Sequence, residues 1–352
     1  MTFALSRRDV LAGSAALAAV AFARPLRAAA PEASAVTPAL IEAARREGGL
    51  RFYSGLDLTL SEIIAKVFEA KYPGVPARVE RSGSERIFQR IGQEQTSGVH
   101  AVDAVVSTDA SHFIGWKRSG WLEPYLPEDV AKHYAAEHVD PDGMYATVCA
   151  SLCTIAYNAN LVRREEAPTS FADLLDPKWK GRLVKAHPGY SGTILTATFA
   201  MVRELGWSYF EKLATQKVMQ VQSAGDPPKK LALGERAVEV DGADSIVLLM
   251  QEQGQPVEVV HAREGTPLIV TPAGIFRRAP HPNAARLFQN FLFSAEGQQV
   301  LVDNARHSFH ALVKPKPGRP PLSAIKLMKS DPLEVEAQSE EIKARYTKIF
   351  GV

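Results

Sequence analysis

Hydroxyl, glycine and acidic side chains gather where the sequence passes from a short apolar run into an amphipathic one. The densest such place is "HPGYSGT" at 187–193, directly before the apolar stretch "ILTATFAMVREL". A helix N-cap needs only one of these side chains. Glycines let a ligand approach backbone N–H groups, and the helix dipole favours an anion there. We therefore expect ligand contacts from Tyr190, Ser191, Gly192 and Thr193.

Five further junctions have the same character. N-capping explains any single one of them, because a capping side chain contributes about 1 kcal/mol. Six such junctions in one chain indicate a ligand-binding site, since ligands of open parallel sheets bind where strands end and helices begin. The additional candidates are Ser54, Gly55 and Asp57, then Ser82, Gly83 and Ser84, then Ser107, Thr108 and Asp109, then Ser223, and finally Asp241 and Asp244.

The charges of these loops leave the ligand's chemistry open between an anion and a zwitterion. Only Arg81 and Arg86 flank the loops with positive charge, so we expect recognition mainly by neutral donors. Several carboxylates beside one cleft would repel an anion. They could instead hold an ammonium group, sugar hydroxyls or a metal ion, and a zwitterion would satisfy both kinds of group.

No enzyme motif is complete in the sequence. Ser191 in "GYSGT" lacks the Gly-x-Ser-x-Gly spacing of a nucleophile elbow, and His187 lies too close along the chain to be its obvious base. His307 and His310 could share a helical face, but no third metal ligand is nearby in the sequence. Neither a Walker A sequence nor Gly-x-Gly-x-x-Gly occurs. We expect a binding protein without catalytic residues, cofactor or resident metal.

The first 30 of the 352 residues have the character of an export signal. Arg7 and Arg8 precede the apolar run 10–23, and three alanines offer a cleavage site near Ala30. The Ser-Arg-Arg-x-x-Leu pattern is typical of a twin-arginine signal, with an ordinary secretion signal as the alternative. Cleavage takes away four of the 41 basic residues and one of the 39 acidic ones, which leaves 37 and 38. This near-neutral balance gives no support for nucleic-acid binding.

Cys149 and Cys153 are the only cysteines in the chain. They lie in "YATVCASLCTIAYN", which is rich in residues that favour strands. Positions four apart on a continuous strand are about 13 Å from each other, which is beyond the reach of a disulfide. We expect two buried free thiols, and a bridge only if a turn intervenes at 150–152.

Alternating apolar and amphipathic segments predict an α/β fold with a largely parallel sheet. In the first half, the strands are expected at 50–56, 75–82 and 101–107, and the helices at 60–72, 84–95 and 110–120. A long run rich in strand-forming residues at 145–157 separates this set from a second α/β set. The chain has ample apolar material for two domains, because 46% of its residues are hydrophobic.

Four segments resemble one family of transport proteins. They are "FYSGLD", "DLLDPKWKGRL" (173–183), "HPGYSGT", and "GTPLIVTPAGIFRRAPHPNAARLFQNFLFSAEGQQVL". Together they are similar to the periplasmic solute-binding proteins of ABC importers, in particular the ferric-iron-binding type, which also includes receptors for phosphonates, phosphorylated sugars and thiamine. The resemblance covers roughly residues 48–350.

The resemblance implies a two-lobed periplasmic binding protein fold, type II-like, with crossing β hinge segments and the ligand clamped in a cleft between the lobes. It places residues 31–147 plus 268–295 in lobe 1 and 148–267 plus 296–352 in lobe 2, after the signal peptide 1–30. It also implies a monomer in the periplasm that binds a small molecule and delivers it to an ABC permease in the inner membrane. A sensory protein feeding a membrane kinase would use the same cleft.

The sequence departs from the iron-binding members of that family. Asp57 stands where they have a histidine, and Asp109 could stand for their acidic residue. Their adjacent tyrosine pair is missing, because the corresponding stretch 241–245 reads Asp-Gly-Ala-Asp-Ser. We therefore expect an oxygen-rich organic anion or zwitterion, such as a phosphonate or a phosphorylated or carboxylated compound, with ferric iron as the alternative cargo.

Overall fold

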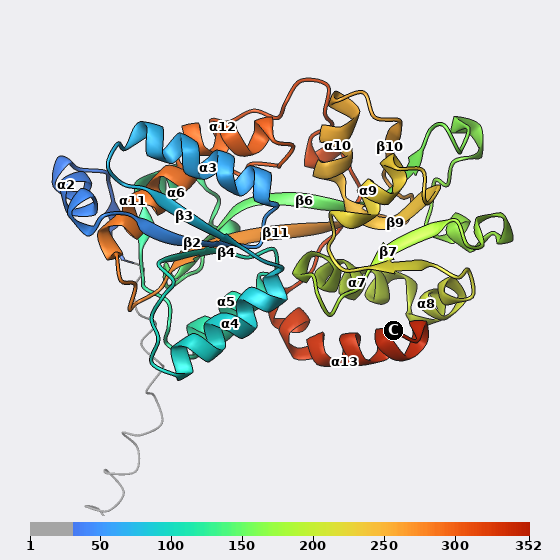
Figure 1. Ribbon diagram of the computed structural model, residues 1–352, viewed down its shortest axis with the longest axis horizontal. Helices are drawn as coiled ribbons and strands as arrows, with labels where there is room; N and C mark the ends of the chain where they lie inside the picture. Colours follow the sequence, from blue (N-terminus) through green and yellow to red (C-terminus); the bar gives the residue numbers. More distant parts are fainter. Residues whose placement is uncertain (1–30) are drawn as a thin grey trace, which may run out of the picture.

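In the part of the chain that the structure describes, ten strands form one continuous sheet that runs through both halves of the molecule (Figure 1). The computed structural model describes residues 31–352, so the predicted signal segment lies outside the described residues. The strand order is β3-β2-β4-β11-β6-β9-β7-β8, with β10 paired to β6 and β12 paired to β11. The strands of this sheet are β2 (Leu50–Ser54), β3 (Ala77–Arg81), β4 (Ala104–Val106), β6 (Tyr145–Asn158), β7 (Leu183–Ala186), β8 (Met219–Val221), β9 (Val238–Ala243), β10 (Val257–Val260), β11 (Thr266–Ile275) and β12 (Leu327–Met328).

Helices cover both faces of this sheet (Figure 1). They are α2 (Pro38–Glu47), α3 (Leu58–Lys71), α4 (Ser84–Thr96), α5 (Ser111–Arg118), α6 (Glu128–His133), α7 (Gly192–Leu205), α8 (Trp207–Ala214), α9 (Asp226–Ala232), α10 (Asp244–Glu252), α11 (Pro282–Phe293), α12 (Ala295–Asp303) and α13 (Pro332–Phe350). A separate two-stranded sheet pairs β1 (Ala33–Ser34) with β5 (Leu126–Pro127).

Two long strands are shared between the halves of the molecule. β6 pairs antiparallel with β11 along residues 145–152, and with β9 along residues 153–157. The far end of β11 pairs with β4, so β11 also reaches from one half to the other. Parallel strands β2, β3 and β4 complete the first lobe, and parallel strands β7, β8 and β9 complete the second. The predicted α/β architecture with crossing β segments is confirmed.

Each lobe has its own apolar core. In the first lobe the rings of Phe52, Phe68, Phe288 and Phe291 contact one another, with centroids 4.8–5.6 Å apart. A second cluster, in the other lobe, includes Trp179 and Phe210. Burying each of these aromatic side chains contributes about 1.5–3 kcal/mol, which makes each lobe a rigid support for its loops.

The carboxyl ends of the parallel strands lead into helices whose N-termini face the other lobe. β2 leads into α3, β3 into α4, β7 into α7 and β9 into α10. Asp57 caps α3 by accepting a hydrogen bond from the Leu60 N–H at 2.9 Å, and Ser191 caps α7 through the Ile194 N–H at 3.4 Å. Capping fixes the junction loops, and it accounts for part of the hydroxyl and acid pattern in the sequence.

The C-terminal helices do not follow the division that we expected from the sequence. α12 packs on α11 and α3 of the first lobe, although residues 296–352 were expected in the second. α13 packs on α7 and α8 of the second lobe and also on α5 of the first, running along both lobes (Figure 1). The boundary near residue 296 therefore does not match the packing of α12.

Both cysteines lie in the continuous strand β6. Cys149 and Cys153 are buried and free, which confirms the prediction of unpaired thiols. Burial raises the pKa of the Cys149 thiol to about 11, so this thiol is protonated at neutral pH. Among residues 31–352, no helix combines the length and apolar character that crossing a bilayer requires.

Candidate functional site

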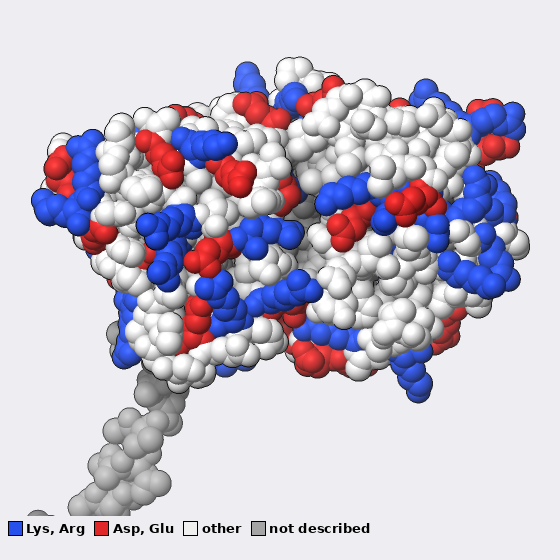
Figure 2. Space-filling view, viewed as in Figure 1, with Lys and Arg blue, Asp and Glu red and all other residues white. Residues whose placement is uncertain are grey.

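A cavity of about 260 Å³ lies between the two lobes, at the ends of the parallel strands. On the face shown in Figure 2, the lobes meet along a furrow that has basic side chains on both sides. Junction loops from both lobes line the cavity, which is what the sequence pattern predicts for a ligand cleft. The predicted residues that line it are Gly55, Asp57, Gly83, Ser84, Thr108, Tyr190, Ser191, Thr193 and Ser223.

Four of the other predicted residues point into the first lobe or lie beside the cavity without lining it. The Ser54 hydroxyl is bonded to Ser61 at 2.8 Å, and the Ser107 hydroxyl to Nδ1 of His112 at 2.9 Å. Ser82 donates its backbone N–H to the Ser54 carbonyl. Asp109 is buried and accepts a hydrogen bond from the Ser111 N–H. These groups shape the loops that the cavity residues occupy.

The two acidic candidates near β9 are also turned inward. Asp241 is fully buried and accepts a hydrogen bond from Nζ of Lys185 at 2.6 Å. Burial raises the pKa of Asp241 to about 6, although the Lys185 ammonium works against that rise. Asp244 accepts backbone hydrogen bonds from Leu152 and Ser245 and lines a different cavity. Neither carboxylate lines the cleft cavity. Their hydrogen bonds instead hold β9 and the start of α10 in place.

Two glycines lie where the backbones of the two lobes approach each other closely. A Cβ atom on Gly192 would lie 2.6 Å from Cβ of Asp109 and 3.2 Å from Cβ of Ser84. A Cβ atom on Gly83 would lie 2.6 Å from the Tyr190 carbonyl oxygen. Gly192, predicted to contact ligand, therefore lies where α7 of one lobe packs on the loops of the other. These close approaches identify the arrangement as one in which the lobes are closed on each other.

Sequence reasoning missed several polar residues of the cavity. Arg306, Ser151 and Gln222 line it, and so do Arg81 and Arg86, which we had placed only at its flanks. Three arginines thus line the cavity together with the neutral donors and the carboxylates of Asp57 and Asp226, which is more positive charge than we expected from the sequence. Arg86 also donates to Oε1 of Gln222 across the lobes at 3.1 Å.

Arg306 joins the two lobes at the floor of the cavity. Its Nη2 donates to Oδ2 of Asp57 at 2.9 Å, and its Nη1 donates to the Ser245 hydroxyl at 2.5 Å. Asp57 belongs to the start of α3 in the first lobe, and Ser245 to the start of α10 in the second. No local pattern in the sequence predicts this role. Arg306 follows an ordinary amphipathic helix and lies 249 residues after Asp57 in the chain.

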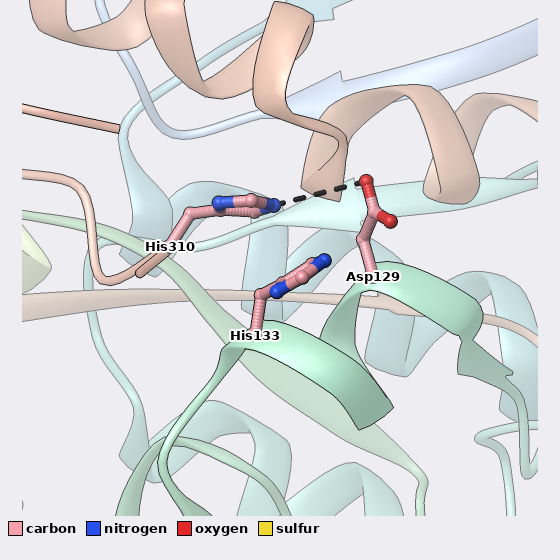
Figure 3. Close-up of side chains that lie close together, drawn as sticks. All are labelled: Asp129, His133 and His310. Atoms are coloured by element: carbon pink, nitrogen blue, oxygen red, sulfur yellow. Dashed lines mark ion pairs between the residues drawn. The ribbon is translucent and has the colours of Figure 1, made fainter. Parts of the chain in front are cut away.

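Within residues 31–352, two other groups of side chains have the composition of metal ligands. In the first, shown in Figure 3, Asp129 and His133 of α6 lie close to His310. Nδ1 of His310 accepts a hydrogen bond from the Leu312 N–H at 3.2 Å, so Nε2 holds the proton of the neutral ring and points toward Asp129 at 3.7 Å. At that distance Nε2 of His310 makes no hydrogen bond to Asp129, and none of the three residues lines the cleft cavity.

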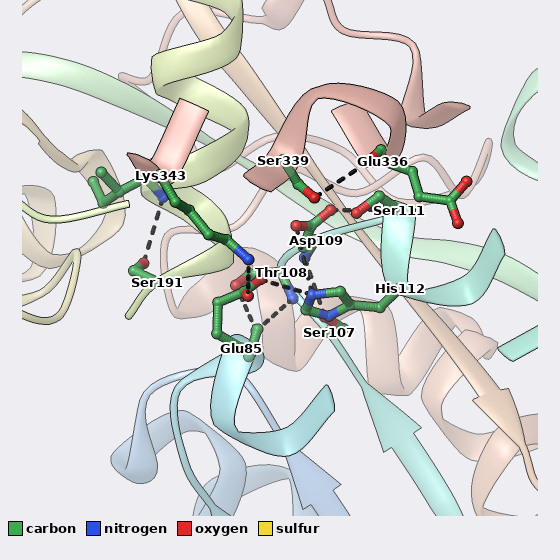
Figure 4. A network of polar contacts seen from close by, with 12 residues as sticks. Glu85, Ser107, Thr108, Asp109, Ser111, His112, Ser191, Glu336, Ser339 and Lys343 are labelled. Carbon is green, nitrogen blue, oxygen red and sulfur yellow. Dashed lines mark hydrogen bonds and ion pairs between the residues drawn. The ribbon is translucent and has the colours of Figure 1, made fainter. Parts of the chain in front are cut away.

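The second group is the polar network of Figure 4. Glu85 accepts hydrogen bonds from His112 at 2.8 Å and from Nζ of Lys343 at 2.6 Å, while Asp109 lies beside His112. The Lys343 ammonium, carried by α13, occupies the position that a cation would take next to Glu85. The network thus ties α13 to the first lobe and leaves the carboxylate already paired.

We expect Glu85 to make stability depend on acid. Burial alone would raise the pKa of Glu85, but His112 and Lys343 bring it down to about 2, below its ordinary value of 4.5. Because the pKa of Glu85 is lower in the folded protein than in the unfolded chain, its ionised form stabilises the fold by about 3 kcal/mol. This stabilisation is complete above about pH 4.5 and is lost as the pH falls toward 2. Chemical denaturation of Glu85→Gln should show lower stability at pH 7 and a flatter dependence between pH 4.5 and 2 than the unaltered protein. Parallel curves for the two proteins would contradict this assignment.

Comparison with known proteins places the chain in a family. Residues 102–321, more than half of the chain, match the model of a family described as bacterial extracellular solute-binding protein, and the chain belongs to that family. The structure of the periplasmic binding protein AfuA from Actinobacillus pleuropneumoniae, with fructose-6-phosphate bound, is similar in fold. Its TM-score is 0.79 at 24% identity, covering 87% of this chain and 99% of that one. This likeness confirms the two-lobed fold that the sequence predicted.

Two relatives of known sequence differ in the cargo that their names state. A putative 2-aminoethylphosphonate-binding periplasmic protein of Salmonella typhimurium is 25% identical over 241 residues, which is 65% of this chain and 67% of that protein. Iron uptake protein A1 of Synechocystis is 22% identical over 260 residues, which is 70% of this chain and 71% of that protein. The family is therefore shared by proteins named for organic phosphorus compounds and for iron.

Proposed function

We propose that this protein is the periplasmic substrate-binding component of an ABC importer, and that it delivers a small organic anion or zwitterion to a permease. The class of ligand that we propose is a phosphonate, or a phosphorylated or carboxylated compound. One observation carries the proposal: the cavity between the lobes combines three arginines with hydroxyl groups from both lobes. Guanidinium and hydroxyl donors are the groups that proteins use to bind phosphate and carboxylate oxygens.

The donors suffice for a useful affinity. Hydrogen bonds to a charged group contribute about 1.5–3 kcal/mol each, and a micromolar dissociation constant corresponds to roughly 8 kcal/mol. Four or five such bonds, reduced by the cost of ordering the ligand and closing the lobes, reach this range. An affinity of this size suits a receptor that must also release its ligand.

The mechanism that follows is hinge closure about β6 and β11. Ser84 and Thr108 come from the first lobe, whereas Ser191 and Thr193 come from the second. A ligand can contact both sets only when the lobes are closed, so binding shifts the population toward the closed form. The permease would then distinguish loaded from empty protein by the shape of the closed lobes.

A thermal-shift screen of the purified protein tests the proposal. The compounds are 2-aminoethylphosphonate, fructose-6-phosphate, simple carboxylates, polyamines, thiamine and ferric citrate. A ligand at 100 times its dissociation constant adds about 2.7 kcal/mol to the stability, which is readily measured. A shift with one organic anion or zwitterion class supports the proposal, and a shift with ferric ion alone would overturn it.

Ferric iron is the second candidate, because one relative is named as an iron uptake protein. Selective ferric sites in this family use phenolate ligands, and Tyr190 is the one tyrosine among the residues that line the cavity. The lining carboxylates Asp57 and Asp226 are both hydrogen-bonded within the protein, to Arg306 and to the Ser223 N–H. The donor set therefore favours the organic ligand.

We expect the double substitution Ser191→Ala with Thr193→Ala to weaken binding of the ligand found in that screen by about 10-fold or more, because two neutral hydrogen bonds are lost. Isothermal titration calorimetry gives the dissociation constant. Ser191 also caps α7, so the control is Thr37→Ala with Ser294→Ala, which removes two helix caps outside the cavity. Unchanged affinity in the first variant would remove the second-lobe hydroxyls from the site.

A further inference from the structure

The backbone around Arg306 is fixed to a strand that both lobes share. Arg306 donates its backbone N–H to the Leu301 carbonyl at 2.9 Å, after Ala305 has turned the chain with a φ of 63°. The next residue, His307, exchanges two backbone hydrogen bonds with Ala150 of β6, each 2.9 Å long. The arginine therefore rises from the hinge into the cleft, where both lobes can reach it.

The guanidinium group of Arg306 is incompletely satisfied. Its side chain is only 7% exposed, and it donates hydrogen bonds to Asp57 and Ser245. A guanidinium has five N–H donors in a planar fork. Nε is buried and has no hydrogen-bond partner among residues 31–352. Nη1 and Nη2 each carry two N–H groups and each has one acceptor among residues 31–352, so their second N–H groups are the donors left for an anion in the cavity that Arg306 lines.

Asp57 holds this guanidinium with only one of its oxygens. Oδ1 caps α3 through the Leu60 N–H, whereas Oδ2 accepts from Arg306. The Asp57 side chain is 27% exposed and lines the same cavity as Arg306. An anion seated on the guanidinium would lie within a few ångströms of Oδ2, and the repulsion between two like charges at such distances is large in a closed cleft.

We propose that Arg306 anchors the anionic group of the ligand, and that Asp57 neutralises Arg306 in the ligand-free protein and gives up this contact when the ligand binds. The inference rests on the proposed function and names the residue that selects for charge. Phosphate, phosphonate and carboxylate groups share the geometry that a guanidinium fork accepts in pairs of hydrogen bonds. Competition from Asp57 weakens ligand binding, and it eases release because the carboxylate replaces the departing anion.

The experiment measures dissociation constants by calorimetry for four probes: inorganic phosphate, 2-aminoethylphosphonate, fructose-6-phosphate and citrate. Asp57→Asn keeps a good N-cap for α3 but removes the competing charge, so we expect about 5- to 20-fold tighter binding. Arg306→Lys keeps the charge without the fork, and should lose about 10-fold. Arg306→Gln should lose about 100-fold. Arg45→Gln, which removes an exposed arginine paired with Glu42 on α2, is the control for net charge and should bind as the unaltered protein does.

The double variant Asp57→Asn with Arg306→Gln separates the proposed competition from a general change in the cleft's charge. If Asp57 acts only through Arg306, Asp57→Asn should not increase the ligand affinity of a protein that already carries Arg306→Gln. Weaker binding by Asp57→Asn, or the same gain with and without Arg306, would overturn the competition. Arg306→Gln binding as tightly as the unaltered protein would overturn the anchor while leaving the proposed function intact. Failure of the unaltered protein to bind any of the four probes would overturn both.

Discussion

Replacing Gly192 by alanine is expected to weaken ligand binding by about two orders of magnitude while leaving the folded protein at least as stable. An alanine Cβ would lie 2.6 Å from Cβ of Asp109 and 3.2 Å from Cβ of Ser84, and both side chains are buried. Neither can move aside, so the lobes must separate. Gly192 is the first residue of α7, where alanine is an equal or better helix former. The added methyl group therefore raises the free energy of closing the lobes and does not lower the stability of the folded protein.

The measurement pairs calorimetry with small-angle scattering. With the ligand found by the thermal-shift screen present, Gly192→Ala should show a larger radius of gyration than the unaltered protein, because the ligand can close only the unaltered protein fully. Gly92→Ala is the matched control, because Gly92 lies inside α4 with nothing within 4 Å of an added Cβ. It should keep both the affinity and the compact shape. A Gly192→Ala variant that binds and closes normally would mean that the observed lobe contact does not define the ligand-bound form.

The parts of the site that follow from local sequence could be predicted, because they obey local rules. "YSGT" and "SGLD" each combine a strand end, a cap and a glycine, and the residues that line the cavity come largely from such junctions. Arg306 obeys no local rule. Its position depends on the pairing of His307 with Ala150 in β6, a contact between segments more than 150 residues apart. Periodicity and capping carry no information about that pairing.

Asp241 shows the opposite error of prediction, because its local sequence resembles that of a cavity residue and yet it does not line the cavity. Asp241 looks like Asp57 in the sequence, since each lies where a strand gives way to a helix. β9 is buried along its whole length, however, so the side chain of Asp241 is enclosed by protein. The one signal available was Lys185, a lysine inside the apolar strand "LVKA". A buried strand does not hold an ammonium group without a carboxylate partner, so the lysine implied that some acid must point inward.

Lys185→Met is expected to destabilise the second lobe by about 3–5 kcal/mol, the usual cost of removing one partner from a buried ion pair. Both Lys185 and Asp241 have side chains with no exposed surface, and their Nζ and Oδ2 atoms are 2.6 Å apart. Without the ammonium, burial raises the pKa of Asp241 further above its present value of about 6. Denaturant unfolding at neutral pH measures the loss. Lys132→Met, which breaks an exposed pair with Glu128, should cost less than about 1 kcal/mol.

The pH dependence of Lys185→Met separates a stranded charge from a simple loss of packing. A carboxyl whose folded-state pKa lies above its unfolded value is favoured in the protonated form, so the penalty should be full at pH 8 and shrink as the pH falls toward 5. The double variant Lys185→Met with Asp241→Leu replaces the pair by apolar side chains and should recover most of the stability at every pH. If the double variant stays as unstable as the single one, the pair itself is the source of stability. Recovery would show that the ion pair adds little net stability, so that its role is to fix β9 beside the loops that close on the ligand.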